Sequence, residues 1–142
     1  MSKPVFRNPD KFQVLEFREW IRENLPSGAD GTVVEDLDVI LRVYGERYDT
    51  DEKGKFMLLE LKYGNAWIDY AQKKTFGLLD DLLRRAGPES NRYVGFFVAQ
   101  YDDEDWDASE FRVNRKSLTR EEFFRFLQFD EEVLSAIPAL EW

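Results

Sequence analysis

An apolar segment that carries two charged residues constrains the fold of this chain more than any other feature. The segment Phe56–Tyr63 reads FMLLELKY, and within it Glu60 and Lys62 stand two residues apart. Residues i and i+2 of a strand project from one face about 7 Å apart, so Glu60 and Lys62 would point together while Leu59 and Leu61 pack on the opposite side. Because burial of an unpaired charge is costly, both charged side chains need partners.

A second strand is predicted upstream, over Val33–Tyr44. One parity of this segment is apolar and the other is mostly polar: Leu37, Val39, Leu41 and Val43 against Asp36, Asp38, Ile40, Arg42 and Tyr44. Such alternation is typical of a strand with one buried face. If the two strands pair as an antiparallel hairpin through the loop Glu46–Gly54, Asp38 meets Glu60 near one end of the sheet. We therefore expect two carboxylates and the Lys62 ammonium group to converge there.

This combination of side chains suits a divalent metal ion. Magnesium binds through one or two carboxylates while it keeps several waters, and it can lower the pKa of an attacking water. A lysine nearby can position that water or stabilise the charge that develops on phosphorus. The order Asp38 … Glu60-x-Lys62 resembles the motif of the PD-(D/E)xK nuclease superfamily, whose members have the restriction-endonuclease-like fold.

The segments DVILR, beginning at Asp38, and LLELK, ending at Lys62, look like the motif hairpin of RecB-type and Holliday-junction-resolvase-type members. The resemblance implies that Asp38 and Glu60 bind Mg²⁺ or Mn²⁺, that the Leu61 carbonyl can complete the metal site, and that Lys62 is catalytic. Gln72, in the helix after the motif, matches a position where such families often carry a glutamine that lines the site. No proline precedes Asp38, a position that varies in the superfamily.

An ordinary cross-strand salt bridge on a half-solvated hairpin is the alternative interpretation of Asp38, Glu60 and Lys62. For Gln72, the alternative to a role in the site is simple exposure to solvent on the surface of a helix. Some superfamily members direct one more acid at the metal from the first helix, and the candidates here are Glu16 and Glu19. A plain solvated face is the alternative for those two glutamates.

The net charge of −9 argues against broad, nonspecific binding of duplex DNA unless charge is segregated. The segment Tyr101–Asp107 is an acidic loop, for which solvation is the simpler interpretation and a role in binding a protein the other. Basic residues gather elsewhere, and the candidates for phosphate contacts are Lys73, Lys74, Arg112, Arg115, Lys116 and Arg120.

Composition narrows the chemistry further. The chain has 142 residues, 43% of them hydrophobic, which predicts a single compact domain over 1–142. It contains neither cysteine nor histidine, so disulfides, zinc–cysteine sites and Ser-His-Asp triads are excluded. No segment resembles a signal peptide or a membrane span, and we expect a soluble cytoplasmic protein that does not associate with membranes.

The remaining pattern predicts an α/β fold. The expected elements are a helix from Asn8–Pro9 to about Pro26, the two strands above, a helix over Ala66–Ala86, a strand over Tyr93–Ala99 covered on both faces, a short strand Phe111–Val113, a helix from a Thr119–Glu122 capping box to about Gln128, and a last short helix capped by Asp130. This order matches a restriction-endonuclease-like αβββαβ core, a central mixed sheet flanked by helices, with a C-terminal helical extension.

These observations favour a small DNA nuclease that depends on Mg²⁺ or Mn²⁺ and recognises DNA structure or ends more than a long sequence. Double-strand cutting by one small domain would call for a homodimer, and two-fold symmetry is the commonest arrangement. A protein partner that supplies targeting is a further expectation. The alternative is a noncatalytic interaction module that keeps the nuclease-like fold and binds a protein through its acidic surface.

Overall fold

The computed structural model of the chain describes residues 12–25, 35–43, 54–86 and 92–142. The chain divides into two compact units, Met1–Val34 and Glu35–Trp142. In the first unit, α1 spans Phe12–Asn24, and exposed Phe17 and Trp20 stack with their ring centroids 6.4 Å apart. The start predicted for this helix at Asn8–Pro9 lies outside the described residues. Within the described ranges, no helix has the length and apolar character needed to cross a membrane.

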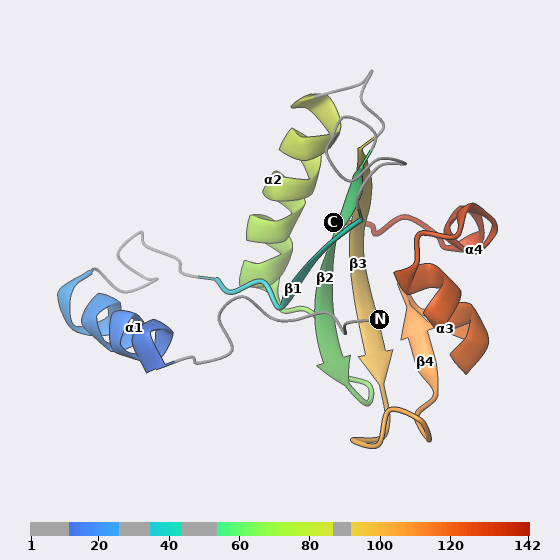
Figure 1. Cartoon of the computed structure of the whole chain (residues 1–142). Coiled ribbons are helices and arrows are strands. Elements are labelled where there is room, and N and C mark those ends of the chain that lie inside the picture. Colours follow the sequence, from blue (N-terminus) through green and yellow to red (C-terminus); the bar gives the residue numbers. More distant parts are fainter. Residues whose placement is uncertain (1–11, 26–34, 44–53, 87–91) are drawn as a thin grey trace. The chain divides into compact units, whose positions relative to one another are not determined.

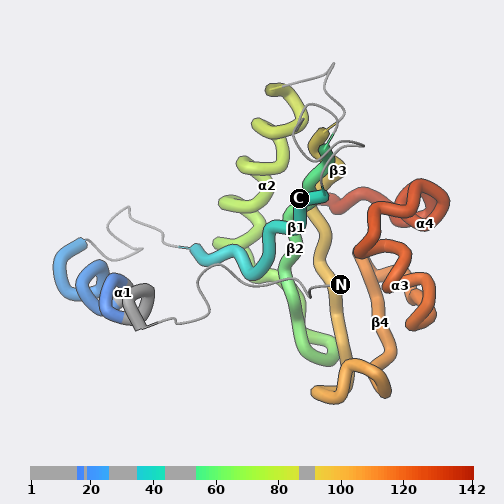
Figure 2. The backbone as a smooth tube through the Cα atoms, viewed as in Figure 1, coloured from blue at the N-terminus to red at the C-terminus, as the bar shows by residue number. Residues whose placement is uncertain are grey.

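The second unit is built on a mixed sheet of five strands in the order β1-β2-β3-β4-β5, of which Figure 1 labels β1 to β4. The strands are β1 (Val39–Val43), β2 (Lys55–Tyr63), β3 (Tyr93–Tyr101), β4 (Phe111–Val113) and β5 (Lys116–Leu118). β1 pairs antiparallel with β2, which confirms the predicted hairpin, and β2 pairs parallel with β3. β3–β4 and β4–β5 are antiparallel. The tube in Figure 2 shows β2 and β3 running side by side.

Helices cover both faces of this sheet (Figure 1). The crossover helix α2 (Tyr70–Ala86) covers one face, where Leu58 of β2 packs with Phe76 of the helix and Phe96 of β3. On the other face, α3 (Arg120–Leu127) and α4 (Glu131–Ala136) pack on a second core that includes Met57 and Leu59. Successive residues of β2 thus alternate between two cores, and this alternation places Glu60 on the α2 face.

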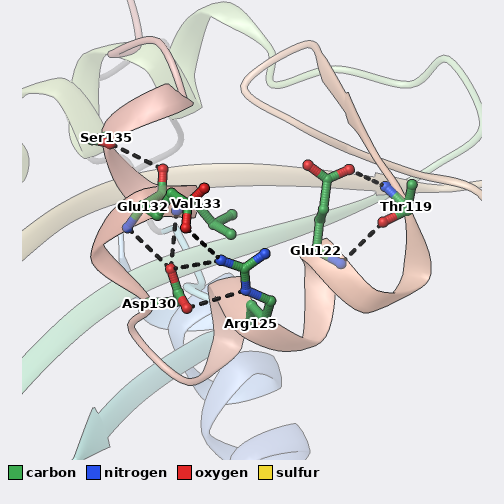
Figure 3. Close-up of polar contacts among 7 residues, drawn as sticks. All are labelled: Thr119, Glu122, Arg125, Asp130, Glu132, Val133 and Ser135. Atoms are coloured by element: carbon green, nitrogen blue, oxygen red, sulfur yellow. Dashed lines mark hydrogen bonds and ion pairs between the residues drawn. The ribbon is translucent and has the colours of Figure 1, made fainter.

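Side chains fix the beginnings of both C-terminal helices (Figure 3). The Thr119 hydroxyl accepts from the Glu122 amide, while the Glu122 carboxylate accepts from the Thr119 amide, which is the predicted capping box. Asp130 caps α4 by accepting from the amides of Glu132 and Val133, as predicted. Arg125 of α3 reaches back to the Asp130 carboxylate at 3.1 Å, so the two short helices are joined by a charged hydrogen bond.

A buried carboxylate on α2 ties the end of the chain to the α2 face. Asp80 is 7% exposed and accepts from the Arg84 guanidinium, from the Tyr93 hydroxyl at 2.6 Å and from the Trp142 indole N–H at 2.9 Å. Burial, together with the hydrogen bond to Asp80, raises the pKa of Tyr93 far above its ordinary range, so the hydroxyl stays a donor. The Trp142 ring packs edge-to-face against Phe96 and also lies close to Gly77 of α2. A Cβ atom at position 77 would come within 3.1 Å of the Trp142 ring, so a glycine gives the ring room there.

The structure departs from the predicted elements in several places, one of which is β3, which ends at Tyr101 and not at Ala99. A strand was predicted over Val33–Tyr44, but β1 begins only at Val39, and residues 35–38 do not pair with β2. Leu37 packs in the core on the α2 face, whereas Val39 packs in the core on the opposite face. α2 begins at Tyr70 and not at Ala66. β5 was not predicted; it pairs with β4 after a tight turn in which Asn114 and Arg115 both have positive φ. Among the described residues, two strands precede α2, so the finer αβββαβ assignment remains a prediction.

Candidate active site

Asp38 and Glu60 meet where β1 begins and β2 nears its end. The Asp38 amide donates to Glu60 Oε2 at 3.3 Å, and the Leu61 amide donates to Asp38 Oδ2 at 2.8 Å. The Asp38 carboxylate thus takes the place that a backbone carbonyl would hold if the ladder continued. This explains why β1 begins at Val39, the residue after Asp38. The approach of the two carboxyl groups agrees with the hairpin parity in the sequence. Glu60 is 4% exposed, whereas Asp38 is exposed.

Lys62 lies on the same face as Glu60 and is held by the first turn of α2. Its Nζ donates to Gln72 Oε1 at 3.1 Å and lies 3.9 Å from Glu60 Oε1. Gln72 Nε2 in turn approaches the same Glu60 oxygen at 3.5 Å. The glutamine therefore bridges the lysine and the acid, and the ion pair itself is long.

The position of Gln72 is set by the way α2 begins. The Gln72 amide donates to Asp69 Oδ1 at 2.8 Å, and Gln72 Oε1 accepts from the Asp69 amide at 3.1 Å. This reciprocal pair is a capping box with Asp69 as N-cap. It explains the start of the helix at Tyr70, and it means that the helix cap and the site share one side-chain oxygen. The pattern Asp-x-x-Gln was visible in the sequence but was not singled out.

Glu60 carries the clearest electrostatic perturbation. Its pKa is raised from 4.5 to about 7, chiefly by burial and next by the charge of the neighbouring Asp38 carboxylate. The hydrogen bond from the Asp38 amide and the charge of Lys62 act in the opposite direction without cancelling it. The charge of Lys62 therefore does not offset the cost of burying the Glu60 carboxylate. In a simple salt bridge the lysine would offset that cost. A carboxylate pair that repels in this way gains from a bound cation.

Two more groups border the site: Glu35, which sequence reasoning did not select, and the Leu61 carbonyl, which the family resemblance implied. The pKa of Glu35 is raised by partial burial and then by the charges of Asp69 and Asp36, while Lys62 lowers it. The Leu61 carbonyl is the other group. Because the amide and carbonyl of one strand residue point to the same edge, the carbonyl faces the edge where Asp38 accepts from the Leu61 amide.

The donor set available to a cation is small. Within the described ranges, no group of three or more acidic, histidine or cysteine side chains is close enough to hold a metal ion. Two carboxylates and one carbonyl, those of Asp38, Glu60 and Leu61, are hard oxygen donors that fit Mg²⁺ or Mn²⁺, which keep several water ligands. Glu16 and Glu19 are exposed on α1 in the first unit and are not among the side chains that the second unit brings together.

The basic residues expected to contact phosphate have different partners in the structure. Arg112 donates to the Gly64 carbonyl, and Arg115 stacks on Trp67 with 3.9 Å from the guanidinium carbon to the ring centroid. Both arginines therefore brace the segment that joins β2 to α2. Elsewhere, Arg120 pairs with Asp107 of the acidic loop at 2.6 Å, Lys116 is half-buried on β5, Lys74 lies over the Tyr70 ring, and Lys73 is exposed on α2.

Comparisons with known proteins do not place the chain in a family: no family model matches it, and searches of curated proteins and of solved structures found no match.

Proposed function

We propose that this chain is a DNA nuclease of the PD-(D/E)xK type that uses Mg²⁺ or Mn²⁺ to hydrolyse phosphodiester bonds. The observation that carries the proposal is the meeting of Asp38, Glu60 and Lys62 at one end of the β1–β2 hairpin, with the buried acid undercompensated by the lysine. An ordinary salt bridge would bring the lysine closer to the acid and would lower the pKa of Glu60.

In the proposed reaction, Asp38, Glu60 and the Leu61 carbonyl would hold the metal ion. That ion supplies a Lewis acid for the scissile phosphate and a water of lowered pKa. Lys62 would orient the attacking water and stabilise the charge on the phosphorus oxygens. Gln72 positions the Lys62 ammonium through its 3.1 Å hydrogen bond, and the α2 cap fixes Gln72 in turn.

The alternative function is a noncatalytic module that binds a protein through the acidic loop Tyr101–Asp107. Several carboxylates of this loop form hydrogen bonds within the loop and with the residues that follow it. Asp103 accepts from the Asp105 amide, Asp105 accepts from the Asp107 amide, and Asp102 accepts from Ser109 and Glu110. These hydrogen bonds stabilise the loop, so the presence of the acidic residues is explained without a protein partner. We therefore favour the nuclease, while the homodimer, the targeting partner and the cytoplasmic location stay predictions.

A cleavage assay on linear, branched and single-stranded DNA tests the proposal. We expect product in millimolar Mg²⁺ or Mn²⁺, none in chelator, and none from Lys62→Ala. Lys55→Ala is a matched control, because Lys55 lies on the same strand but pairs with exposed Glu131 far along the strand from the site. Cleavage that persists in chelator, or in Lys62→Ala preparations, would remove the proposed site from consideration.

A further inference from the structure

The exposed side of α2 carries positive charge on an acidic protein. The helix has four basic and two acidic residues, whereas the whole chain has 20 basic and 29 acidic ones. Both acids lie in the C-terminal half of the helix, and each is paired with the arginine four residues later. Lys73 and Lys74, in the N-terminal half, are exposed and form no ion pair with a described residue. The first half of α2 therefore attracts anions.

Both lysines line a pocket of about 410 Å³ on the side of the helix, the α2 pocket. Its other described lining residues are aromatic, apolar or small, and none is an acid: Tyr70, Gly77, Leu78 and Trp142. A larger pocket of about 800 Å³, on β3 to β5, differs because its lining includes Asp102, Glu110 and Glu122. Of these two pockets, only the α2 pocket combines cations with apolar surface and lacks acids that would compensate the charge.

The apolar walls of the α2 pocket are open to solvent. Tyr70 is 74% exposed, Leu78 61% and Trp142 40%. The Trp142 indole N–H donates to Asp80 at 2.9 Å, which fixes that ring, and Lys74 Nζ lies 5.4 Å from the centre of the Tyr70 ring. A helix normally turns polar side chains to solvent, so large apolar residues beside two lysines indicate a surface that a ligand covers.

The combination of groups determines which ligand fits. An ammonium group binds phosphate as a point charge, whereas aromatic side chains bind the flat faces of nucleobases. A DNA duplex offers its phosphates but hides the faces of its bases, so Tyr70, Leu78 and Trp142 would stay exposed beside it. An unpaired strand presents phosphates and base faces in turn. A single strand therefore uses the whole lining of the α2 pocket.

We propose that the α2 pocket binds an unpaired segment of a DNA strand, with phosphates on its lysines and a base against its aromatic rings. The proposal rests on the proposed nuclease function and specifies its substrate: DNA with a single-stranded end or gap. Lys73 directly follows Gln72, whose side chain contacts Lys62, so the α2 pocket and the candidate active site share the first turn of α2.

Binding of short oligonucleotides in chelator tests the α2 pocket without relying on cleavage. We expect a labelled oligothymidylate of about 12 nucleotides to bind at least about tenfold more tightly than an abasic chain of the same length, measured by fluorescence anisotropy. The abasic chain keeps every phosphate, so the difference reports contacts with bases alone. The same oligonucleotide paired with its complement should lose the advantage over the abasic chain.

Substitutions at exposed positions assign that difference to the α2 pocket. Tyr70→Ala should weaken binding of the oligonucleotide at least about fivefold and leave binding of the abasic chain unchanged, while Tyr70→Phe, which keeps the ring, should change neither. Phe124→Ala, the control, removes an exposed aromatic ring from α3 on the opposite face of the sheet. Lys73→Gln combined with Lys74→Gln should lower the slope of log affinity against log salt by about 1.4, at about 0.7 for each phosphate contact, and Lys55→Gln should leave that slope unchanged.

Equal binding of the oligonucleotide and the abasic chain, or a duplex bound as tightly as the single strand, would mean that the pocket attracts only a polyanion and would overturn the proposal. Unchanged affinity in Tyr70→Ala, or an unchanged slope in the double lysine variant, would do the same. Base-dependent binding by a protein that never cleaves DNA would refute the nuclease alone. Cleavage by a protein without base-dependent binding would refute the α2 pocket alone.

Discussion

Replacement of Glu60 by glutamine should stabilise the metal-free protein at alkaline pH and not at acidic pH. The substitution keeps the size of a side chain that is 4% exposed and removes its charge. The acid has its pKa raised from 4.5 to about 7, chiefly by burial and next by Asp38. A raised pKa for an acid means that the folded state binds the proton more tightly than the unfolded state does. The free energy of unfolding therefore falls as the pH rises through the window from 4.5 to 7.

The size of the effect follows from that window. At 1.36 kcal/mol per pKa unit, ionised Glu60 costs the folded state about 3 kcal/mol above pH 7, as an upper value. Glutamine at position 60 loses the attraction to Lys62, and its amide group lies near Gln72 Nε2. Both effects reduce the stabilisation that is gained by removing the charge. We expect Glu60→Gln to be more stable than the parent by about 1–2 kcal/mol at pH 8, and equal or less stable at pH 5.

Urea unfolding of both proteins in chelator, at pH 5, 6, 7 and 8, measures this difference. Because the other ionisable groups are common to the two proteins, their contributions largely cancel in the comparison. If Glu60 were a favourable salt-bridge partner, Glu60→Gln would be the less stable protein at pH 8. That sign, or a difference that does not change between pH 5 and 8, would refute the electrostatic reasoning.

Three further sets of substitutions address the site, the DNA surface and the fold. Lys62→Ala should abolish cleavage while calorimetry shows nearly unchanged affinity for Mn²⁺, and Lys62→Arg should not restore activity, because a planar guanidinium does not replace a compact charge. Charge reversal at Arg115 and Lys116 should weaken DNA binding and lower the slope of log affinity against log salt by about one per lost phosphate contact, measured by anisotropy; an unchanged slope would move the DNA surface towards Lys73 and Lys74. Asp80→Asn should lower the free energy of unfolding by about 2–4 kcal/mol, since it leaves Arg84 underpaired and sets an amide against buried donors; a loss below 1 kcal/mol in urea would contradict this role.

The sequence predicted those parts of the fold in which a local pattern and the tertiary structure agree. The segment Lys55–Tyr63 has apolar residues at both parities, and a strand buried on both faces is what forms there. The capping box at Thr119 and the cap at Asp130 involve contacts within three residues, so the sequence alone contains them. The approach of Asp38 to Glu60 follows from strand parity once the hairpin is assumed.

Other parts depend on contacts between distant segments. β5 has three residues, too few for a periodic signal, and it exists because Asn114, whose side chain bonds the Val98 amide and the Pro138 carbonyl, holds a turn with positive φ. The basic residues between Arg112 and Arg120 are close in sequence, yet their partners come from distant segments: Arg112 and Arg115 contact the segment after β2, whereas Arg120 pairs with Asp107.

A thermal melt of the parent and Asp38→Asn, in chelator and then in millimolar Mg²⁺ or Mn²⁺, tests the central claim most directly, because it needs no knowledge of the DNA substrate. If Asp38 and Glu60 form a metal site, the substitution relieves repulsion, so the metal-free variant melts at the same temperature as the parent or higher. Added metal then stabilises the parent and has much less effect on the variant. A metal-free variant that is clearly destabilised, with the same response to metal in both proteins, would mean that Asp38, Glu60 and Lys62 form only a salt bridge.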